Sequence, residues 1–372
     1  MDFKREYNII IGSKTYFENV LSKSNLRNSK YFLELIQISD YRKKNNIDCD
    51  IRVNCLVLEN NNYHGIVEAA HDRLPSIIEE LTTDNASIYL HNPPRILREY
   101  LQDLDKREII ILKEQKQKYE MLKDSKKFDM NINAVKDNII GQDPAIREVS
   151  KSLWYLTKVN RKKPYVIMFY GKSSLGKTEL VREISKNFFN YKYLEKHLSM
   201  FKNSVYSDYF FGKSPNRRSF AYDLLERESN LLFFDEMDKC PEYFFSAFYT
   251  LFDNTTFKDA TYDVDISGLV IILTSNYQNE REIMEHLGLP IYYRIDKFVH
   301  FKEFDVSTIY SIVLKELKDR KEEYSDILSL DDVYAAVSPK ILTEKENART
   351  IKQKVQYVIE DLLFSNHLDD DK

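Results

Sequence analysis

The chain is poor in several kinds of residue, and each scarcity excludes a class of protein. Its 372 residues include three cysteines, too few and too scattered for a disulfide framework, so we expect a reducing, cytoplasmic environment. No apolar run approaches the ~18 residues of a membrane span, and the N-terminus lacks a signal peptide's apolar segment, so no membrane partner is expected. A net charge of −4 gives the whole molecule no electrostatic reason to bind nucleic acid.

Glycine is also rare. The chain has 8 glycines, about 2 % of its residues against a typical ~7 %. Where glycine does occur, we expect the backbone conformation to require it. Gly141, Gly171, Gly176 and Gly212 all lie within the motifs described below. The glycine positions therefore guide the search for a functional site.

The first ~115 residues are predicted to form a small α/β domain. Runs rich in Ile and Val predict strands at residues 8–11, 51–58, 87–90 and 109–112, and amphipathic stretches predict helices at 77–81 and 95–104. No catalytic spacing occurs in this part. We expect residues 1–115 to fold separately and to sense a ligand or recognise a partner, and the charged stretch 116–135 to be a linker.

A phosphate-binding loop is the most specific motif of the chain. The apolar run YVIMFY (residues 165–170) predicts a buried strand, GKSSLGKT (171–178) follows at once, and 179–189 has helical periodicity. Strand, loop and helix in this order are the context that G-x-x-x-x-G-K-[ST] requires. Backbone N–H groups and the helix N-terminus would hold the phosphates, Lys177 would reach the β- and γ-phosphates, and Thr178 would ligate Mg²⁺. The expected nucleotide-binding residues here are Gly171, Ser173, Ser174, Leu175, Gly176, Lys177 and Thr178.

Two later strands are predicted to bring polar side chains to the same edge of the sheet. The apolar run 231–234 ends in Asp235 and Glu236, and the run 269–273 is followed by Thr274, Ser275 and Asn276. Ligands bind at the carboxyl edge of parallel sheets. Asp235 would hold Mg²⁺ through water, Glu236 would polarise the attacking water, and Asn276 would hydrogen-bond that water or the γ-phosphate. The sequence therefore predicts ATP and Mg²⁺ as cofactors and ATP hydrolysis as the reaction.

Together these motifs resemble the AAA+ superfamily, and within it the Clp-type chaperone ATPases. Residues 235–276 are similar to the Clp segment from Walker B to sensor 1. IIGQ (139–142) resembles the family's entry motif, and LPIYYRID (289–296) resembles its "PEFLNRID" motif. NARTIK (347–352) is similar to the "GARPLK" of sensor 2, although it departs at two positions. The resemblance covers the C-terminal two thirds of the chain.

The resemblance implies a role for each residue that matches a family motif. Ile139 and Ile140 would cover the adenine. Asn276 would be sensor 1, and Arg294 would be the arginine finger supplied to a neighbouring subunit. Arg349 would touch the γ-phosphate from the helical lid, and the alternative for it is a surface arginine on a lid helix.

The implied fold class is α/β. An AAA+ P-loop parallel sheet flanked by helices is expected over residues 136–303, with a small helical lid over 304–366, beside the separate N-terminal α/β domain. The resemblance also implies a homo-oligomer, expected to be a hexameric ring, that acts on a protein substrate or effector, with residues 1–115 as the contact.

Two departures from the family pattern bear on function. FFG (210–212) leads to the place of the pore loop, but the Gly-aromatic-Val-Gly segment that grips polypeptide is missing. Arg217 and Arg218 stand there instead, in a turn that could meet a nucleic-acid backbone or an acidic partner, or simply be solvated. The stretch between Asn276 and Arg294 is short. Leu287-Gly288-Leu289 superficially fits a peptidase-docking loop but abuts the arginine-finger motif, where a turn is expected, so docking to a Clp-type peptidase is not expected.

The sequence leaves two functions in competition. In the first, the protein is an ATP-driven remodeller of a protein partner, which the Clp likeness favours. In the second, it is a nucleotide-dependent oligomerising switch that recruits an effector, as in bacterial defence or signalling, which the missing pore aromatic favours. A third function, a DNA-directed motor, is supported only by Arg217 and Arg218.

Overall fold

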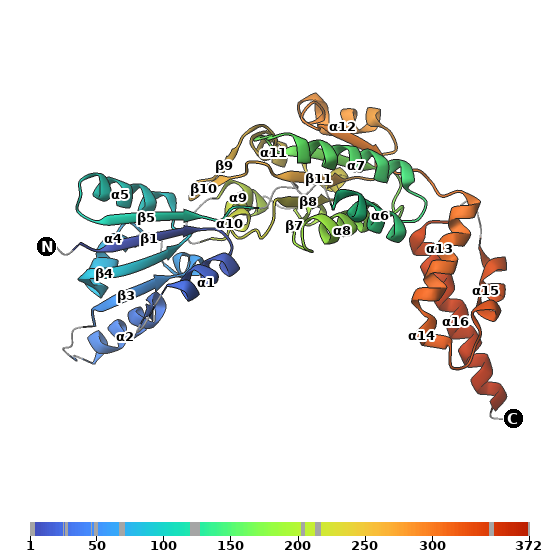
Figure 1. Cartoon of the computed structure of the whole chain (residues 1–372), viewed down its shortest axis with the longest axis horizontal. Helices are drawn as coiled ribbons and strands as arrows, with labels where there is room; N and C mark the ends of the chain where they lie inside the picture. The colour runs from blue at the N-terminus through green and yellow to red at the C-terminus, as the bar shows by residue number, and fades with distance from the viewer. Residues whose placement is uncertain are drawn as a thin grey trace.

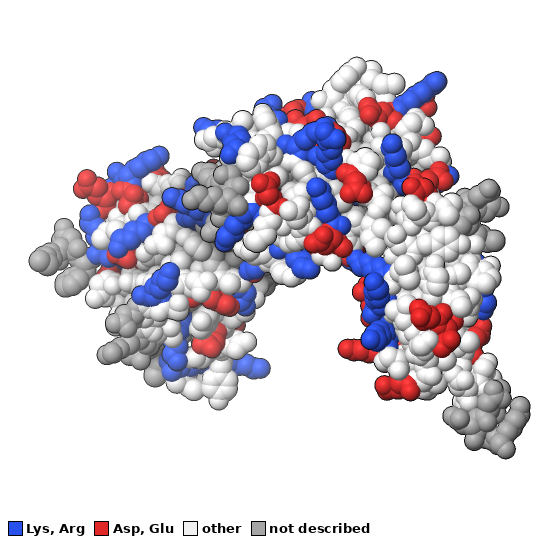
Figure 2. All heavy atoms as spheres, turned by 45° about the vertical axis from the view of Figure 1, so that its right-hand side comes forward, with Lys and Arg blue, Asp and Glu red and all other residues white. Residues whose placement is uncertain are grey.

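Three bodies follow one another along the chain: an N-terminal sheet with its helices, a central sheet with its helices, and a C-terminal group of helices (Figure 1). The computed structural model describes residues 4–24, 26, 29–45, 47, 51–66, 71–119, 127–201, 205–212, 217–341 and 346–370. Among these residues no helix combines the length and the apolar character needed to cross a membrane. On the face shown in Figure 2, positive and negative side chains lie interspersed over all three bodies.

The N-terminal body is a parallel five-stranded sheet in the order β2-β3-β4-β1-β5. Its strands are β1 (Glu6–Ile11), β2 (Lys30–Tyr31), β3 (Val53–Leu58), β4 (Thr82–His91) and β5 (Ile111–Lys116), and its helices are α1 (Lys14–Lys23), α2 (Phe32–Lys44), the 3₁₀ helix η1 (Asn60–Gly65), α4 (Leu74–Leu81) and α5 (Arg95–Lys106). Successive side chains of a strand point to opposite faces. Accordingly Ile9 packs in the core cluster that includes α4 and α5, whereas Ile10 packs on Phe17 of α1.

The central body is also built on a parallel sheet, in the order β12-β6-β11-β8-β7. Its strands are β6 (Tyr165–Tyr170), β7 (Leu194–His197), β8 (Leu231–Asp235), β11 (Val270–Thr274) and β12 (Lys297–His300). The surrounding helices are α6 (Phe128–Asn138), α7 (Asp143–Lys158), α8 (Lys177–Phe188), α9 (Val205–Phe211), α10 (Phe220–Leu225), α11 (Phe245–Asp253) and α12 (Glu280–Tyr292), with a hairpin of β9 (Thr256–Lys258) and β10 (Asp263–Asp265). The strands that precede the three predicted polar motifs, β6, β11 and β8, are neighbours, so their carboxyl ends meet.

Alternating side chains of β6 build two cores, one on each face of the central sheet. Val166 and Met168 belong to the cluster formed with α10 and α11, and Ile167 and Phe169 belong to the cluster formed with α7 and α8. All four side chains are fully buried. Burial of a side chain of this size contributes about 1.5–3 kcal/mol, so the strand that leads into the P-loop is firmly anchored on both faces.

The C-terminal body consists of α13 (Val306–Asp319), α14 (Lys321–Tyr324), α15 (Leu330–Val337) and α16 (Ala348–Asp370). Ile309 and Val313 of α13 pack with Val333 of α15 and Val355 of α16 in a separate small core. The side chain of Asp305 accepts a hydrogen bond from the backbone of the first turn of α13, which fixes where this helix begins.

The predicted linker over 116–135 differs from the structure at both ends. β5 continues to Lys116, and α6 begins at Phe128. The ring of Phe128 lies 5.5 Å from that of Phe188 on α8, and Val135 is buried in the central core. Residues 128–135 are therefore part of the central body, and residues 120–126 lie outside the described residues.

Candidate functional site

A cavity of about 460 Å³ lies at the carboxyl edge of the central sheet, where α16 approaches it. Its walls come from the segments that follow β6, β8 and β11 and from the start of α16. The residues predicted from the sequence that line it are Ser173, Ser174, Gly176, Lys177, Thr178, Asp235, Glu236, Asn276 and Arg349. Three motifs far apart in the sequence thus face one space.

The loop between β6 and α8 takes the shape that its glycines allow. Gly176 has φ 92° and ψ 12°, a left-handed conformation that other residues rarely adopt, and it is the N-cap of α8. A Cβ added there would meet no atom within 4 Å, so the space above the loop is open. By contrast, a Cβ at Gly171 would lie 2.5 Å from the Phe301 carbonyl oxygen, which requires glycine for close packing against β12.

Lys177 points into this loop and is 7 % exposed. Its Nζ donates to the carbonyl oxygens of Gly171 and Lys172 at 2.6 Å each, and lies 3.4 Å from Asn276 Oδ1. Burial lowers the pKa of Lys177 to about 8, against the opposing effect of the Asp238 and Asp235 carboxylates. The ammonium group is therefore short of negative charge, which a phosphate would supply.

This pKa predicts proton uptake when nucleotide binds above pH 8. A bound phosphate favours the charged form of Lys177 and raises its pKa, so at pH 8.5 to 9 a partly neutral lysine should take up a proton. Calorimetry of ATP binding in buffers of different ionisation enthalpy measures this directly. Lys186→Ala, in the last turn of the same helix, should keep the uptake and Lys177→Ala should lose it. Binding without proton exchange at pH 9 would show that Lys177 stays charged.

Thr274, the last residue of β11, holds the two acidic residues at the end of β8. Its hydroxyl donates to Asp235 Oδ1 and accepts a hydrogen bond of 3.1 Å from the Glu236 backbone N–H. Glu236 itself has φ 60° and ψ 49°, a left-handed conformation that is unusual for a residue other than glycine. Thr274 was not among the site residues expected from the sequence, because only the pairing of β11 with β8 brings it beside Asp235.

Asp238 is a second residue that the sequence reasoning missed. Its Oδ1 accepts a 3.1 Å hydrogen bond from the Asn276 backbone N–H, and its Oδ2 lies 3.4 Å from the Asn276 side-chain amide nitrogen. It thereby fixes the orientation of the Asn276 side chain beside Lys177. Its position in the sequence, three residues after Asp235, was the signal that could have identified it.

The start of α16 closes the cavity from the C-terminal body. The Ala348 backbone N–H donates to the Ser174 carbonyl oxygen at 3.1 Å, and Arg349 and Lys352 line the cavity beside it. The side chain of Asn347 accepts hydrogen bonds from the backbone N–H groups of Arg349 and Thr350. Asn347 therefore caps this helix, which gives a physical reason for asparagine at a position where the family motif has glycine.

Several predicted site residues do not line the cavity. Ile139 is buried in the core with α6 and α7, and Ile140 is half-buried outside the cavity lining. Gly171 and Leu175 shape the loop from behind. Arg294 lies elsewhere. Its Nε is 2.6 Å from Asp253 Oδ2 and its guanidinium stacks over Tyr249.

β7 adds a further group that the sequence reasoning did not single out. His197 Nδ1 lies 3.5 Å from Asp235 Oδ2, and His197 Nε2 lies 3.5 Å from Glu195 Oε1. One ligand atom from each of these three residues falls within 4.8 Å of the others. β7 pairs with β8, so this group includes Asp235 and adjoins the cavity rather than forming a separate centre.

The two arginines in the place of the pore loop are engaged within the chain. Arg218 Nε lies 2.5 Å from Asp223 Oδ1, and an Arg217 amino group lies 3.9 Å from Asp208 Oδ2. Both arginines line a cavity of about 500 Å³ together with Tyr209. The remainder of that turn, 213–216, lies outside the described residues.

The residues present fit a magnesium nucleotide. The hydroxyl of Thr178 and the carboxylate of Asp235 are oxygen ligands of the kind that Mg²⁺ prefers, and both line the cavity. The Ser275 hydroxyl also lines it and is buried without a hydrogen-bond partner among the described residues. With the lysine of low pKa and the open space above Gly176, the cavity has donors and room for a phosphate chain.

Comparison with protein families and known proteins points in the same direction. Residues 162–320 match the family model "AAA domain (Cdc48 subfamily)". The chain is 24 % identical over 328 residues to the chaperone protein ClpB of Malacoplasma penetrans, covering 79 % of this chain and 46 % of that protein. It is 25 % identical over 191 residues to the mitochondrial disaggregase of Homo sapiens, covering 46 % of this chain and 26 % of the relative. The chain thus spans less than half the length of these relatives.

Solved structures share the fold. A closed state of Hsp104 with ATPγS and FITC casein aligns with a TM-score of 0.55 at 15 % identity, over 98 % of this chain and 89 % of that one. An Hsp104–ADP complex of S. cerevisiae aligns with a TM-score of 0.50 at 18 % identity, over 66 % of this chain and 40 % of that one. The predicted fold class, parallel sheets flanked by helices with a helical C-terminal body, is confirmed.

Proposed function

We propose that the chain carries an AAA+ domain of the Clp chaperone type, and that it binds ATP with Mg²⁺ and hydrolyses it. One observation carries the proposal. A single cavity collects the buried Lys177, the carboxylates of Asp235 and Glu236, and the amide of Asn276. These are the groups needed to hold a phosphate chain and to position a water molecule beside it.

Each residue has a task that follows from its position. Lys177 would neutralise phosphate charge at the end of the P-loop, and Thr178 and Asp235 would hold the metal ion. Mg²⁺, when bound, neutralises charge that develops on the phosphate oxygens. Glu236 accepts a proton from the attacking water, and Asn276, oriented by Asp238, donates a hydrogen bond to the γ-phosphate or that water.

The direct test is Mg²⁺-dependent phosphate release by the purified chain. Lys177→Ala should abolish phosphate release, because it removes the buried positive charge that neutralises the phosphate chain. Lys186→Ala is the matched control, since this residue lies on the same helix with an exposed side chain that pairs with Glu183. Equal phosphate release by the wild type and Lys177→Ala would exclude this cavity as the catalytic site.

We further propose that the chain assembles into a ring, with six subunits as the expected number, and remodels a protein partner without threading it. Arg294 lies outside its own cavity, which supports a role at a neighbouring subunit's site. The N-terminal body is the proposed contact for the partner. The sequence predicts that it spans residues 1–115. The names of the relatives, a chaperone and a disaggregase, support a protein substrate.

The switch remains the second candidate, and one observation favours it. The N-terminal body is hydrogen-bonded to the segment that leads into β8, the strand carrying Asp235. A ligand or effector at the N-terminal body would therefore act on the nucleotide site through a short path. Phosphate release that changes with an N-terminal ligand, in the absence of any protein substrate, would favour the switch over the remodeller.

A further inference from the structure

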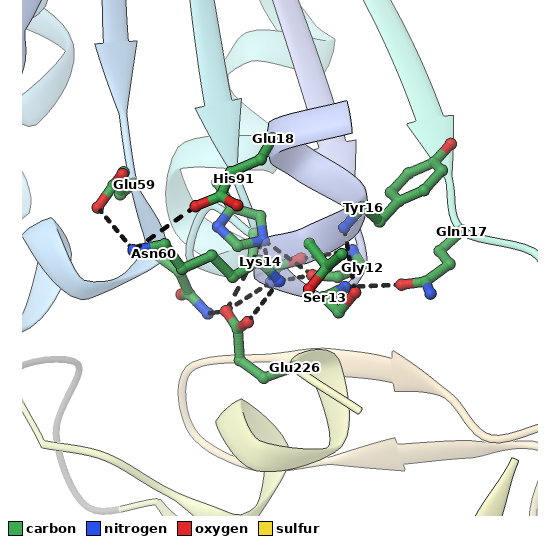
Figure 3. Close-up of polar contacts among 12 residues, drawn as sticks. Gly12, Ser13, Lys14, Tyr16, Glu18, Glu59, Asn60, His91, Gln117 and Glu226 are labelled. Atoms are coloured by element: carbon green, nitrogen blue, oxygen red, sulfur yellow. Dashed lines mark hydrogen bonds and ion pairs between the residues drawn. The ribbon is translucent and has the colours of Figure 1, made fainter. Parts of the chain in front are cut away.

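Glu226 lies between α10 and β8 of the central body, but its carboxylate is bound by the N-terminal body (Figure 3). The backbone N–H of Lys14, in the first turn of α1, donates to Glu226 Oε2 at 2.9 Å. The side-chain amides of Asn60 and Asn92 donate to Oε1 at 2.6 Å and 3.3 Å. His91 Nε2 lies 3.7 Å from the same oxygen, and its hydrogen-bond partner is the Gly12 carbonyl oxygen at 2.8 Å. The four residues around the Glu226 carboxylate, called the oxyanion cradle below, lie at the carboxyl ends of β1, β3 and β4.

The cradle is a built site rather than a chance surface contact. Asn60, His91 and Asn92 are 1 %, 2 % and 0 % exposed. Asn92 is locked in place, since its Oδ1 accepts from the Gly12 N–H at 2.9 Å and its amide also donates to the Gly12 carbonyl oxygen at 2.8 Å. Buried amide donors are costly to leave without an acceptor, and the N-terminus of α1 favours negative charge. The cradle therefore needs an oxygen acceptor and favours a negatively charged one.

A large cavity adjoins the cradle between the two bodies. It measures about 1090 Å³, and Gly12, which is hydrogen-bonded to Asn92, forms part of its wall. Arg227 also lines it and is 5 % exposed. Its guanidinium donates to the carbonyl oxygens of Leu224 and Asp265 and lies 4.2 Å from the ring centre of Tyr119. Its Nε and one amino group also donate to Asn230 Oδ1 at 3.4 Å, and among the described residues no carboxylate forms an ion pair with it. The charged residues that line the cavity are Lys116, Lys118 and Arg227 against Glu114 and Asp265, an excess of positive charge that suits an anionic occupant.

The position matches the general rule for ligands in such sheets. The cradle lies at the carboxyl ends of β1, β3 and β4, and the cavity lies at those of β1 and β5. Parallel α/β sheets bind small molecules at that edge. A cavity of this size holds a small organic molecule. Here the edge is covered by the central body, and the acidic group in the cradle comes from the same chain.

We propose that the carboxyl edge of the N-terminal sheet is a binding site for a small ligand carrying a carboxylate or phosphate group, and that Glu226 occupies its oxyanion cradle in the absence of this ligand. The body of the ligand would lie in the cavity beside Arg227. Because ligand and Glu226 need the same donors, binding would release the central body from the N-terminal one. The site is separate from the ATP cavity and does not depend on ATP hydrolysis.

The test compares anion binding by the full-length wild type, Glu226→Ala and Glu226→Gln. Inorganic phosphate and acetate are titrated separately in a calorimeter, with ADP present throughout so that any background at the P-loop is the same in every variant. Removing the internal carboxylate should tighten binding of one probe by about tenfold or more relative to the wild type. Glu226→Gln keeps the shape of the side chain and should give a smaller gain. Whichever probe shows the gain identifies the oxyanion.

Two controls separate the cradle from general effects. Glu228→Ala removes a neighbouring carboxylate that binds Thr15 and not the cradle, and it should leave anion affinity as in the wild type. Asn60→Ala added to Glu226→Ala should remove the gain. Equal affinity of the wild type and both Glu226 variants for both probes would overturn the proposal.

Hydrogen exchange measures whether the central body is released from the N-terminal body. The backbone N–H of Arg95 donates to the Thr261 carbonyl oxygen at 2.8 Å, a contact between the two bodies. Hydrogen exchange at Arg95 should accelerate in Glu226→Ala and, in the wild type, on adding the probe that binds. Unchanged protection of Arg95 in Glu226→Ala would contradict the role of Glu226 in holding the bodies together.

Discussion

Replacing Glu236 with glutamine is expected to leave ATP binding intact and to lower turnover by about 10²–10⁴-fold. Glutamine keeps the size of the side chain and removes only the carboxylate that accepts the proton of the attacking water. The contacts of Lys177 and Asp235 stay unchanged, because the Thr274 hydroxyl holds Asp235 and not the Glu236 side chain. Nucleotide affinity and single-turnover hydrolysis of the variant measure the two quantities separately.

Glu242→Gln is the matched control for this experiment. Glu242 is an exposed glutamate just beyond the same strand end, in the short 3₁₀ turn Glu242–Phe244, and its side chain does not line the cavity. It should hydrolyse ATP like the wild type. Turnover by Glu236→Gln at the wild-type rate, with ATP saturating, would exclude Glu236 as the general base.

Replacing Arg294 with alanine is expected to lower ATP turnover about as strongly as replacing Glu236 with glutamine. An arginine supplied across an interface is worth ~10³–10⁵ in rate in related nucleotide hydrolases. Arg294→Ala should therefore be almost inactive, and the specific activity of the wild type should rise with protein concentration as head-to-tail contacts form. Mixing Arg294→Ala with Lys177→Ala should restore part of the activity, because roughly a quarter of randomly formed interfaces would pair an intact P-loop with an intact arginine.

The contacts of Arg294 within its own chain call for two controls. Asp253→Ala removes the ion pair at 2.6 Å but keeps the guanidinium, so it should retain activity if the arginine acts on a neighbour. Arg281→Ala removes an exposed arginine of α12, which pairs only with Glu285 among the described residues, and should have no effect. No recovery in co-assembled mixtures, or full activity from a proven monomer, would refute a role in trans.

The sequence predicted those parts of the site that lie in one contiguous motif or directly after a predicted strand. The P-loop is a contiguous motif between a strand and a helix, so its residues needed no tertiary information. Asp235 and Asn276 each follow an apolar strand, and the parallel sheet brings those strand ends together. Thr274, His197 and the interface residue Glu226 were missed, because their partners are set by strand pairing and by contacts between bodies.

Differences in the fold also have physical causes. The run 109–112 predicted a strand, but β5 begins at Ile111 and continues through Lys116. Within the described part of the chain this strand lies at the edge of its sheet beside β1, and its mostly exposed polar side chains give no apolar pattern. The placement of Ile139 over the adenine, implied by the family resemblance, stays a prediction. α6 ends just before Ile139, and the Ile139 side chain is buried in the core cluster with α6 and α7.

The left-handed backbone of Glu236 has a consequence for how this position can vary. A residue other than glycine or asparagine in that conformation carries about 1–3 kcal/mol of strain. Mutation to glycine or asparagine would relieve it, so stability alone drives this position away from glutamate. Only selection on turnover opposes that drift. In descendants of this chain that keep the fold but no longer hydrolyse nucleotide, position 236 should be among the first to change, and those descendants should melt at a higher temperature.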